Sequence, residues 1–287
     1  MTEQTKENVI LLLSCKDQHG LVYKITNFIF KIDGNIIDLD EHVDITAEMF
    51  FIRIAFEVEK DKYTVDELTD KFTHLGNDFN AHWQIHFEEK KQNIAIFVSK
   101  YDHCLQEILW RNSLNEFNIN IRAVISNHDN LKNLAEQNNI PFFHFNITKE
   151  NKHQVEAEQI QTLSKLNIDT IVLARYMQIL SPDFVRKFPN RIINIHHSFL
   201  PAFIGGNPYK QAFQRGVKII GATSHYVTNE LDEGPIIEQD IIRISHNDSL
   251  KDLIRKGRDL ERLVLARALL LHSQYKILVD GKKTIVF

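Results

Sequence analysis

The sequence has little cysteine, no long apolar run and no excess of positive charge. Only Cys15 and Cys104 occur among 287 residues, which excludes a disulfide scaffold and a four-cysteine zinc site. No stretch of 18 apolar residues is present, so a membrane-spanning helix is not expected. Lys and Arg total 34 against 38 Asp and Glu, which gives a net charge of −4. The chain therefore has no excess of positive charge to drive binding to a nucleic acid or an anionic membrane. Free thiols favour a cytoplasmic location.

The chain has an ordinary globular composition, with 43% hydrophobic and 25% charged residues, and its length predicts two domains. Residues 1–88 are expected to form the first. Apolar periodicity there predicts strands at 9–13, 35–44, 49–58 and 81–87 and helices at 21–30 and 64–72. This βαββαβ order is the ferredoxin-like unit. Gly34 is expected to end the first helix in the left-handed conformation, and the charged residues 88–92 are the expected linker.

In residues 89–287, strands alternate with helices, which predicts an α/β domain with a Rossmann-like, mostly parallel sheet. The strand at 94–99 has no polar alternation, as expected when helices cover both faces of a sheet. The strand at 192–195 runs into His196 and His197. Because ligands of open α/β sheets bind beyond the carboxyl ends of the strands, we expect the chemistry at this strand end.

Three polar side chains at or near this strand end form a set suited to acyl-group chemistry. Asn194 and His196 lie two residues apart, so in a strand they project from the same face. Asp232 precedes a Gly-Pro turn that can fold it back over the site. An amide and an imidazole can stabilise an oxyanion, and a carboxylate can take a proton.

Other interpretations of these residues stay open at this point. The Asn-x-His segment can be a satisfied turn, and Asp232 can hold a turn by its own hydrogen bond. A metal site would draw its ligands from His196, His197, His225 and Asp232. Adjacent histidines on a strand face opposite ways, however, so we expect no metal and no other cofactor. A Ser198-His-Asp triad would lack the Gly-x-Ser-x-Gly elbow.

The segments Asn194 to Phe203 and Leu231 to Ile237 resemble the formyltetrahydrofolate-dependent formyltransferase family. That family carries Asn-x-His-x-Ser-x-x-Pro followed, about three dozen residues later, by Leu-Asp-x-Gly. The resemblance implies that Asn194, His196 and Asp232 are the catalytic residues and that folate is the substrate. It also implies a folate pocket lined by Met177, Gln178, Ile179, Leu180, Val227, Thr228, Asn229 and Leu231. Gln178 departs from the glycinamide transferase, which carries Arg there, so folate contacts at this position are expected to rest on backbone groups.

Three features separate hydrolysis from transfer within this family. The position of the transferases' glycine-rich phosphate loop, Val98 to Leu105, contains no glycine here. His197 stands where the transferases usually have Pro. Residues 1–88, which the transferases lack, resemble an ACT domain at Cys15 to Val22 and Gly34 to Ile36. The resemblance thus implies hydrolysis of 10-formyltetrahydrofolate to formate and tetrahydrofolate, which balances one-carbon pools for purine synthesis. Formyl transfer to a small amine and folate binding without turnover are the alternatives.

Several residues have less defined roles. His197 and His225 are candidate accessory residues. His197 either orders water at the site or only packs in a turn. An ACT domain implies a homo-oligomer and an amino-acid effector, for which Asp17, Gly20 and Asn35 are the candidate contacts.

Overall fold

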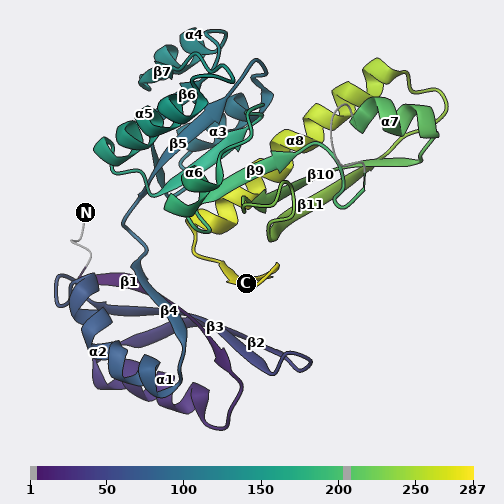
Figure 1. The fold of residues 1–287 in the computed structure, drawn as a ribbon. Helices are drawn as coiled ribbons and strands as arrows, with labels where there is room; N and C mark the ends of the chain where they lie inside the picture. The colour runs from purple at the N-terminus through teal and green to yellow at the C-terminus, as the bar shows by residue number, and fades with distance from the viewer. Residues whose placement is uncertain (1–4, 203–207) are drawn as a thin grey trace. The chain divides into compact units, whose positions relative to one another are not determined.

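The computed structural model describes residues 5–202 and 208–287, and the chain divides into two compact units (Figure 1). The first unit holds residues 1–91, 274–280 and 285–287, and the second holds residues 92–273 and 281–284. The expected boundary at residue 88 lies close to the observed one. The expected second domain, 89–287, needs correction at its C-terminal end. There Leu278, with Ile285 and Phe287, packs on the sheet of the first unit against Ile10 and Phe51.

The first unit has the predicted βαββαβ order. Its elements are β1 (Lys6–Lys16), α1 (Leu21–Lys31), β2 (Asn35–Asp44), β3 (Met49–Glu59), α2 (Val65–Asp78) and β4 (His82–Phe87). The strands form an antiparallel sheet in the order β2-β3-β1-β4. Apolar residues of both helices, among them Ile25, Ile29, Leu68 and Phe72, share one core with the facing side of the sheet. A capping box between Thr64 and Glu67 sets the start of α2.

Gly34 does not end α1 in the left-handed conformation. Asp33 adopts that conformation instead, with φ 57°. The glycine is needed for close packing, because a Cβ at position 34 would lie 2.8 Å from Cγ2 of Ile29.

The second unit is built on a seven-stranded sheet in the order β11-β10-β9-β8-β5-β6-β7. Its strands are β5 (Gln92–Val98), β6 (Ile119–Ser126), β7 (Phe142–His144), β8 (Thr170–Ala174), β9 (Ile192–His196), β10 (Ile219–Tyr226) and β11 (Ile236–Arg243). The strands from β9 to β7 are parallel, and β10 and β11 extend the sheet in the antiparallel sense. The mostly parallel α/β sheet expected from the sequence is thus confirmed.

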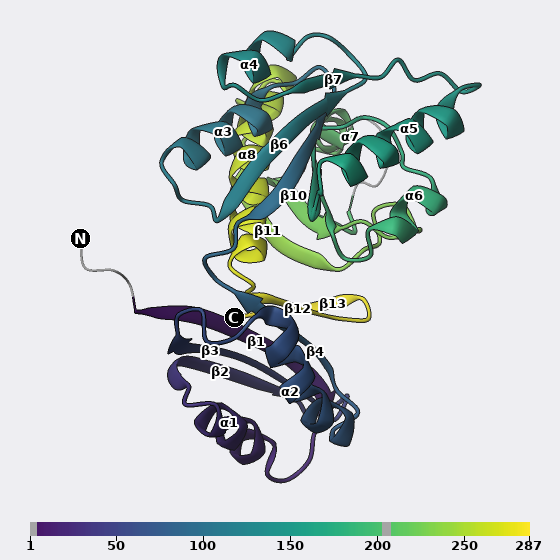
Figure 2. The same cartoon turned by 90° about the vertical axis from the view of Figure 1, so that its left-hand side faces the viewer.

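Helices cover both faces of this sheet (Figure 2). They are α3 (His103–Ser113), α4 (Lys132–Gln137), α5 (Lys152–Lys165), α6 (Pro182–Lys187), α7 (Pro208–Arg215) and α8 (Leu250–Ser273). Helices α3 and α8 pack on one face, and α5 and α6 on the other. The last two strands, β12 (Ile277–Asp280) and β13 (Lys283–Val286), form a hairpin. Within the described ranges, no helix combines the length and the apolar composition needed to cross a bilayer.

Candidate active site

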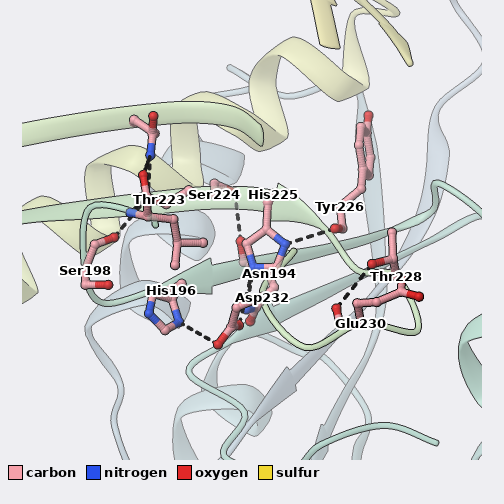
Figure 3. Close-up of polar contacts among 12 residues, drawn as sticks. Asn194, His196, Ser198, Thr223, Ser224, His225, Tyr226, Thr228, Glu230 and Asp232 are labelled. Carbon is pink, nitrogen blue, oxygen red and sulfur yellow. Dashed lines mark hydrogen bonds and ion pairs between the residues drawn. The ribbon is translucent and has the colours of Figure 1, made fainter. Parts of the chain in front are cut away.

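Two neighbouring strands place three of the candidate side chains together at the carboxyl end of β9 (Figure 3). In the antiparallel pairing of β9 with β10, Asn194 lies opposite His225 and His196 lies opposite Thr223. Directly opposed residues of an antiparallel pair share a face of the sheet. Asn194, His196 and His225 therefore project from the same face.

Asp232 returns to this group because the chain folds back sharply after β10. The backbone N–H of Tyr226 donates to the carbonyl of Pro235 at 2.9 Å, which closes the loop between them. A Cβ on Gly234 would lie 1.7 Å from the carbonyl oxygen of Tyr226, so only glycine allows this approach. Asp232 itself has a positive φ of 57°. Its Oδ2 lies 3.2 Å from Nδ1 of His196, and its Oδ1 lies 3.7 Å from Nε2 of His225.

The carboxyl group of Asp232 is held in its ionised form. Burial by itself would raise the pKa of this group. Interactions with the neighbouring imidazoles, first of all that of His196, outweigh burial and hold the pKa of Asp232 well below its ordinary value. A base is therefore available at this position at any pH near neutrality.

His225 fixes the orientation of the Asn194 amide. Its Nδ1–H donates to the backbone carbonyl of Tyr226 at 2.9 Å, which leaves a lone pair on Nε2. That nitrogen accepts a hydrogen bond from Nδ2 of Asn194 at 3.2 Å. An amide nitrogen carries two hydrogens. One is used by His225, and the other remains for a ligand.

The second ring nitrogen of His196 is buried and has no protein partner among the described residues. Its side chain is only 6% exposed. A buried polar atom without a partner is costly, so such an atom at the end of a strand marks a place where a ligand atom binds. Nε2 of His196 and the second hydrogen of the Asn194 amide are thus both available to a ligand.

The loop after His196 is held by the hydroxyl of Thr223. This hydroxyl donates to the carbonyl of Ser198 at 2.9 Å and accepts from the N–H of Leu200 at 3.1 Å and from Nε2 of Gln239 at 2.8 Å. The Ser198 hydroxyl donates to the carbonyl of Ala202 at 2.8 Å. It is therefore engaged in the turn, and the Ser-His-Asp triad considered above finds no support.

The two segments expected to line a folate pocket share one apolar cluster. Leu180 is buried in the core below the β8–α6 loop, and Val227 packs against the same core. Three apolar side chains of these segments lie open to solvent: Met177 is 55%, Ile179 61% and Leu231 57% exposed.

The polar members of these segments differ in exposure. Gln178 and Thr228 are half-buried and Asn229 is exposed, and the hydroxyl of Thr228 donates to the carbonyl of Glu230 at 3.2 Å. Ser99 holds the first segment, because its hydroxyl accepts from the N–H of Met177 at 3.0 Å. This role could not be predicted from local patterns, because Ser99 follows β5 and Met177 follows β8, far apart in the chain.

His197 lies beside the site and packs against Tyr209. Its ring is 5.3 Å from that of His196 and packs edge-on against the ring of Tyr209 at 5.9 Å, measured between centroids. Burial lowers the pKa of His197 to about 4, with the positive charge of Arg175 acting in the same direction. The imidazole is therefore neutral at physiological pH.

Among the four residues of the metal alternative, Nε2 of His196 is without a partner, whereas both nitrogens of His225, the Asp232 carboxylate and the His197 ring have the contacts described above. Within the described part of the chain, the cluster of ligand atoms tight enough for one ion consists of His103, Cys104 and Glu261. Arg175 already forms an ion pair with this glutamate, with 3.3 Å between Nε and Oε2. Burial keeps the pKa of the Cys104 thiol well above its ordinary value, so the side chain packs as a neutral group. These donors do not fit a metal.

The candidate effector residues do not lie together within one chain. Asp17 and Gly20 lie between β1 and α1, where the N–H of Asp17 donates to the carbonyl of Glu48 just before β3. Asn35 begins β2 opposite Glu57, near the other end of β3. This span of β3 corresponds to about 30 Å.

A model of the formyl transferase family matches residues 92–269. A formyltetrahydrofolate deformylase of Synechocystis sp. is 52% identical over 277 residues, which are 96% of this chain and 97% of that protein. The crystal structure of a formyltetrahydrofolate deformylase from Pseudomonas syringae pv. tomato superimposes with a TM-score of 0.95 at 40% identity, covering 100% of this chain and 96% of that one. A glycinamide ribonucleotide transformylase from Symbiobacterium toebii matches with a TM-score of 0.66 at 28% identity, covering 70% of this chain and 97% of its own.

Proposed function

We propose, on the premise that this chain belongs to the formyltetrahydrofolate deformylase family, that it hydrolyses 10-formyltetrahydrofolate to formate and tetrahydrofolate. The enzyme is thus a hydrolase acting on a linear C–N amide bond within one-carbon metabolism. The observation that carries this reaction is the meeting of an ionised carboxylate with two hydrogen-bond donors that have capacity to spare.

Asn194 and His196 form the oxyanion site in this proposal. The formyl oxygen accepts one hydrogen bond from the free hydrogen of Nδ2 of Asn194 and one from Nε2 of His196. The ionised Asp232, 3.2 Å from Nδ1, stabilises the positive charge of a His196 ring that donates through both nitrogens. As water attacks, the carbonyl oxygen gains negative charge, and both donors stabilise it more strongly than in the ground state.

Asp232 is the base that takes the proton of the attacking water. Its Oδ2 is engaged with His196, whereas Oδ1 lies 3.7 Å from His225, beyond hydrogen-bond distance. Oδ1 is thus the oxygen that is available to water. The tetrahedral intermediate then breaks its bond to N10, which receives the proton, and formate leaves. His225 acts through Asn194 and is a positioning residue.

Folate binds between the β8–α6 loop and the β10–β11 loop in this proposal. The exposed side chains of Met177, Ile179 and Leu231 offer apolar cover for a flat heterocycle, while half-buried Gln178 lies between the first two. Backbone groups of both loops supply hydrogen bonds to its edge. No resident metal or organic cofactor takes part in the reaction.

For the first unit, we propose an ACT-like role in regulation and assembly. The strand order β2-β3-β1-β4 and the two helices on one face support this assignment. Strand β2 is an edge strand that leaves Ile37 and Leu39 exposed, and such an edge is suited to pairing with a second copy. Because Asp17 and Asn35 lie at opposite ends of the sheet, an amino-acid effector that contacts both positions requires two chains in a homo-oligomer. A cytoplasmic location remains a prediction.

Incubation with 10-formyltetrahydrofolate and no acceptor tests the proposed reaction. We expect stoichiometric formate and tetrahydrofolate. A transferase would leave the substrate intact until an amine is added, and a folate-binding protein without turnover would leave it intact in both cases. Either result would overturn the proposal.

A further inference from the structure

A buried polar cluster of the second unit lies next to the site and takes no part in the mechanism above. At its centre is Glu261 of α8, only 1% exposed. The hydroxyl of Tyr209 donates to its Oε1, and Nε2 of His103 lies 2.8 Å from its Oε2. Nε of Arg175 lies 3.3 Å from the same Oε2, and the guanidinium of Arg175 stacks on the ring of Tyr101 with 5.5 Å between Cζ and the ring centroid.

The cluster is built to hold the ring of Tyr209. A Cβ on Gly257 would lie 2.2 Å from both Cζ and the hydroxyl oxygen of Tyr209, so α8 carries a glycine where this ring crosses it. Although burial opposes ionisation of Glu261, His103 and Arg175 outweigh it and lower the pKa of the carboxyl. The hydroxyl is therefore bound to a charged acceptor, which gives a stronger hydrogen bond than a neutral one.

Stability alone does not account for this cluster. Removing charged groups from water is costly, and apolar residues of similar volume often stabilise a fold as well or better. The cluster instead determines what lies against His197, because the ring of Tyr209 packs on that imidazole at 5.9 Å.

His197 is the residue through which the buried cluster reaches the site. Thr228 and Glu230 of the folate-lining loop lie beyond Asp232, whereas Ser198 lies on the opposite side of His196 (Figure 3). The ring of His197 lies 5.3 Å from that of His196, so the contact of Tyr209 with His197 connects the cluster to the site. In the proposed binding mode the folate enters from the β10–β11 loop, which leaves the part of the site next to His197 for the incoming nucleophile.

We propose that Tyr209, held by Glu261, His103 and Arg175, fills with His197 the volume that an amine acceptor would need, and so restricts the nucleophile to water. This inference rests on the proposed hydrolysis and makes Tyr209 a specificity-determining residue. If the volume is opened, a small amine can attack the formyl carbon. The bond from carbon to the amine nitrogen forms, the bond to N10 breaks, and the proton lost by the amine goes to N10.

The test measures the partition of formyl groups between water and an added amine. Hydroxylamine is the probe, because formohydroxamate and formate can be quantified in one reaction, with the enzyme-free reaction subtracted. We expect Tyr209→Ala to raise the ratio of formohydroxamate to formate at least about tenfold, the scale on which small changes of pocket volume alter discrimination. Tyr209→Phe keeps the ring and is expected to stay within about threefold of the wild-type ratio. Phe213→Ala, on the same helix and 46% exposed, is the control for loss of an aromatic ring.

An unchanged ratio in a folded Tyr209→Ala enzyme that still releases formate would overturn the inference. If that variant does not fold, as judged by its thermal transition, Tyr209→Leu replaces it, with the same expected direction and the same refuting result. Failure of the proposed function is distinguishable, since it would appear as the absence of formate from the wild-type enzyme without any amine. The ratio is independent of overall loss of activity, so a merely structural role of Tyr209 would not change it.

Discussion

Replacing Asp232 by Asn tests the carboxylate with the least disturbance of its surroundings. Asp232 has a φ of 57°, and Asn tolerates this conformation better than Ala does. The amide retains the shape of the side chain next to His196, but it removes the negative charge and the base. Loss of a general base typically costs a factor of 10²–10⁴ in rate, or roughly 3–5 kcal/mol of transition-state stabilisation. The charge supporting His196 is lost as well, so we expect kcat to fall by at least about a hundredfold.

The assay is formate release from 10-formyltetrahydrofolate without acceptor, followed from pH 5 to pH 9. Because the pKa of Asp232 lies well below this range, the wild-type carboxylate stays ionised throughout it. Asp232 should therefore add no inflection to the wild-type profile in this range, and Asp232→Asn should be slower than wild type at every pH. Glu233→Gln alters the adjacent, exposed carboxylate, which pairs with Lys282, and serves as the matched control. A variant within about threefold of wild type, with the same pH profile, would remove the carboxylate from the mechanism.

Two further predictions concern the site, and a third concerns His86 on β4 of the first unit. Asn194→Ala and His196→Ala should each lower kcat about a hundredfold or more while the thermal transition stays near that of the wild type, since each removes one of the two oxyanion donors of the proposed mechanism. Turnover near wild type would exclude that residue from the mechanism. Activity should withstand prolonged treatment with EDTA, and loss of activity that zinc restores would revive a metal mechanism. Burial lowers the pKa of His86 to about 4. Between pH 6.5 and pH 4 the imidazole is therefore protonated in the unfolded state but not in the folded state. The free energy of unfolding consequently falls as the pH falls through this range. His86→Phe retains a ring that can stack on Tyr275 but has no group to protonate. In denaturant titrations, lowering the pH from 8 to 5 should reduce the free energy of unfolding of this variant by about 2 kcal/mol less than that of the wild type. An equal reduction in both proteins would contradict this reasoning.

The order of the elements could be predicted from the sequence because it depends on local periodicity. The alternation of 49–58 and the helical spacing of 21–30 each report which side of a segment is apolar. These patterns do not indicate which other element of the fold the apolar side packs against. The C-terminal residues illustrate the difference: Leu278 and Phe287 are plainly apolar, yet only the tertiary structure places them on the sheet of the first unit. Gly34 illustrates it again, since its role depends on the distance to Ile29 and not on its own φ.

The site could be predicted in part, to the extent that its geometry is local. Strand alternation was enough to put Asn194 and His196 on one face, and the Gly-Pro pair after Asp232 indicated a return of the chain. The role of His225 depends on the register of β10 against β9, which sets it opposite Asn194. That register follows from a pairing between segments about thirty residues apart, which no local pattern specifies. Ser99 could not be assigned for the same reason, because its partner Met177 follows a different strand.

Glu261 is a different case, because the sequence contained a usable signal. Gly257, Leu260, Glu261 and Val264 lie along the buried face of α8, so the acid falls on an apolar stripe with a glycine one turn before it. A charged residue in that position must be paired, since an isolated buried carboxylate is too costly to persist. The glycine further indicates that another group passes close to the helix at that turn. Both inferences were available from periodicity alone. The identity of the partners was not, because Tyr209, His103 and Arg175 come from three other segments that the sheet topology brings to the same helix face.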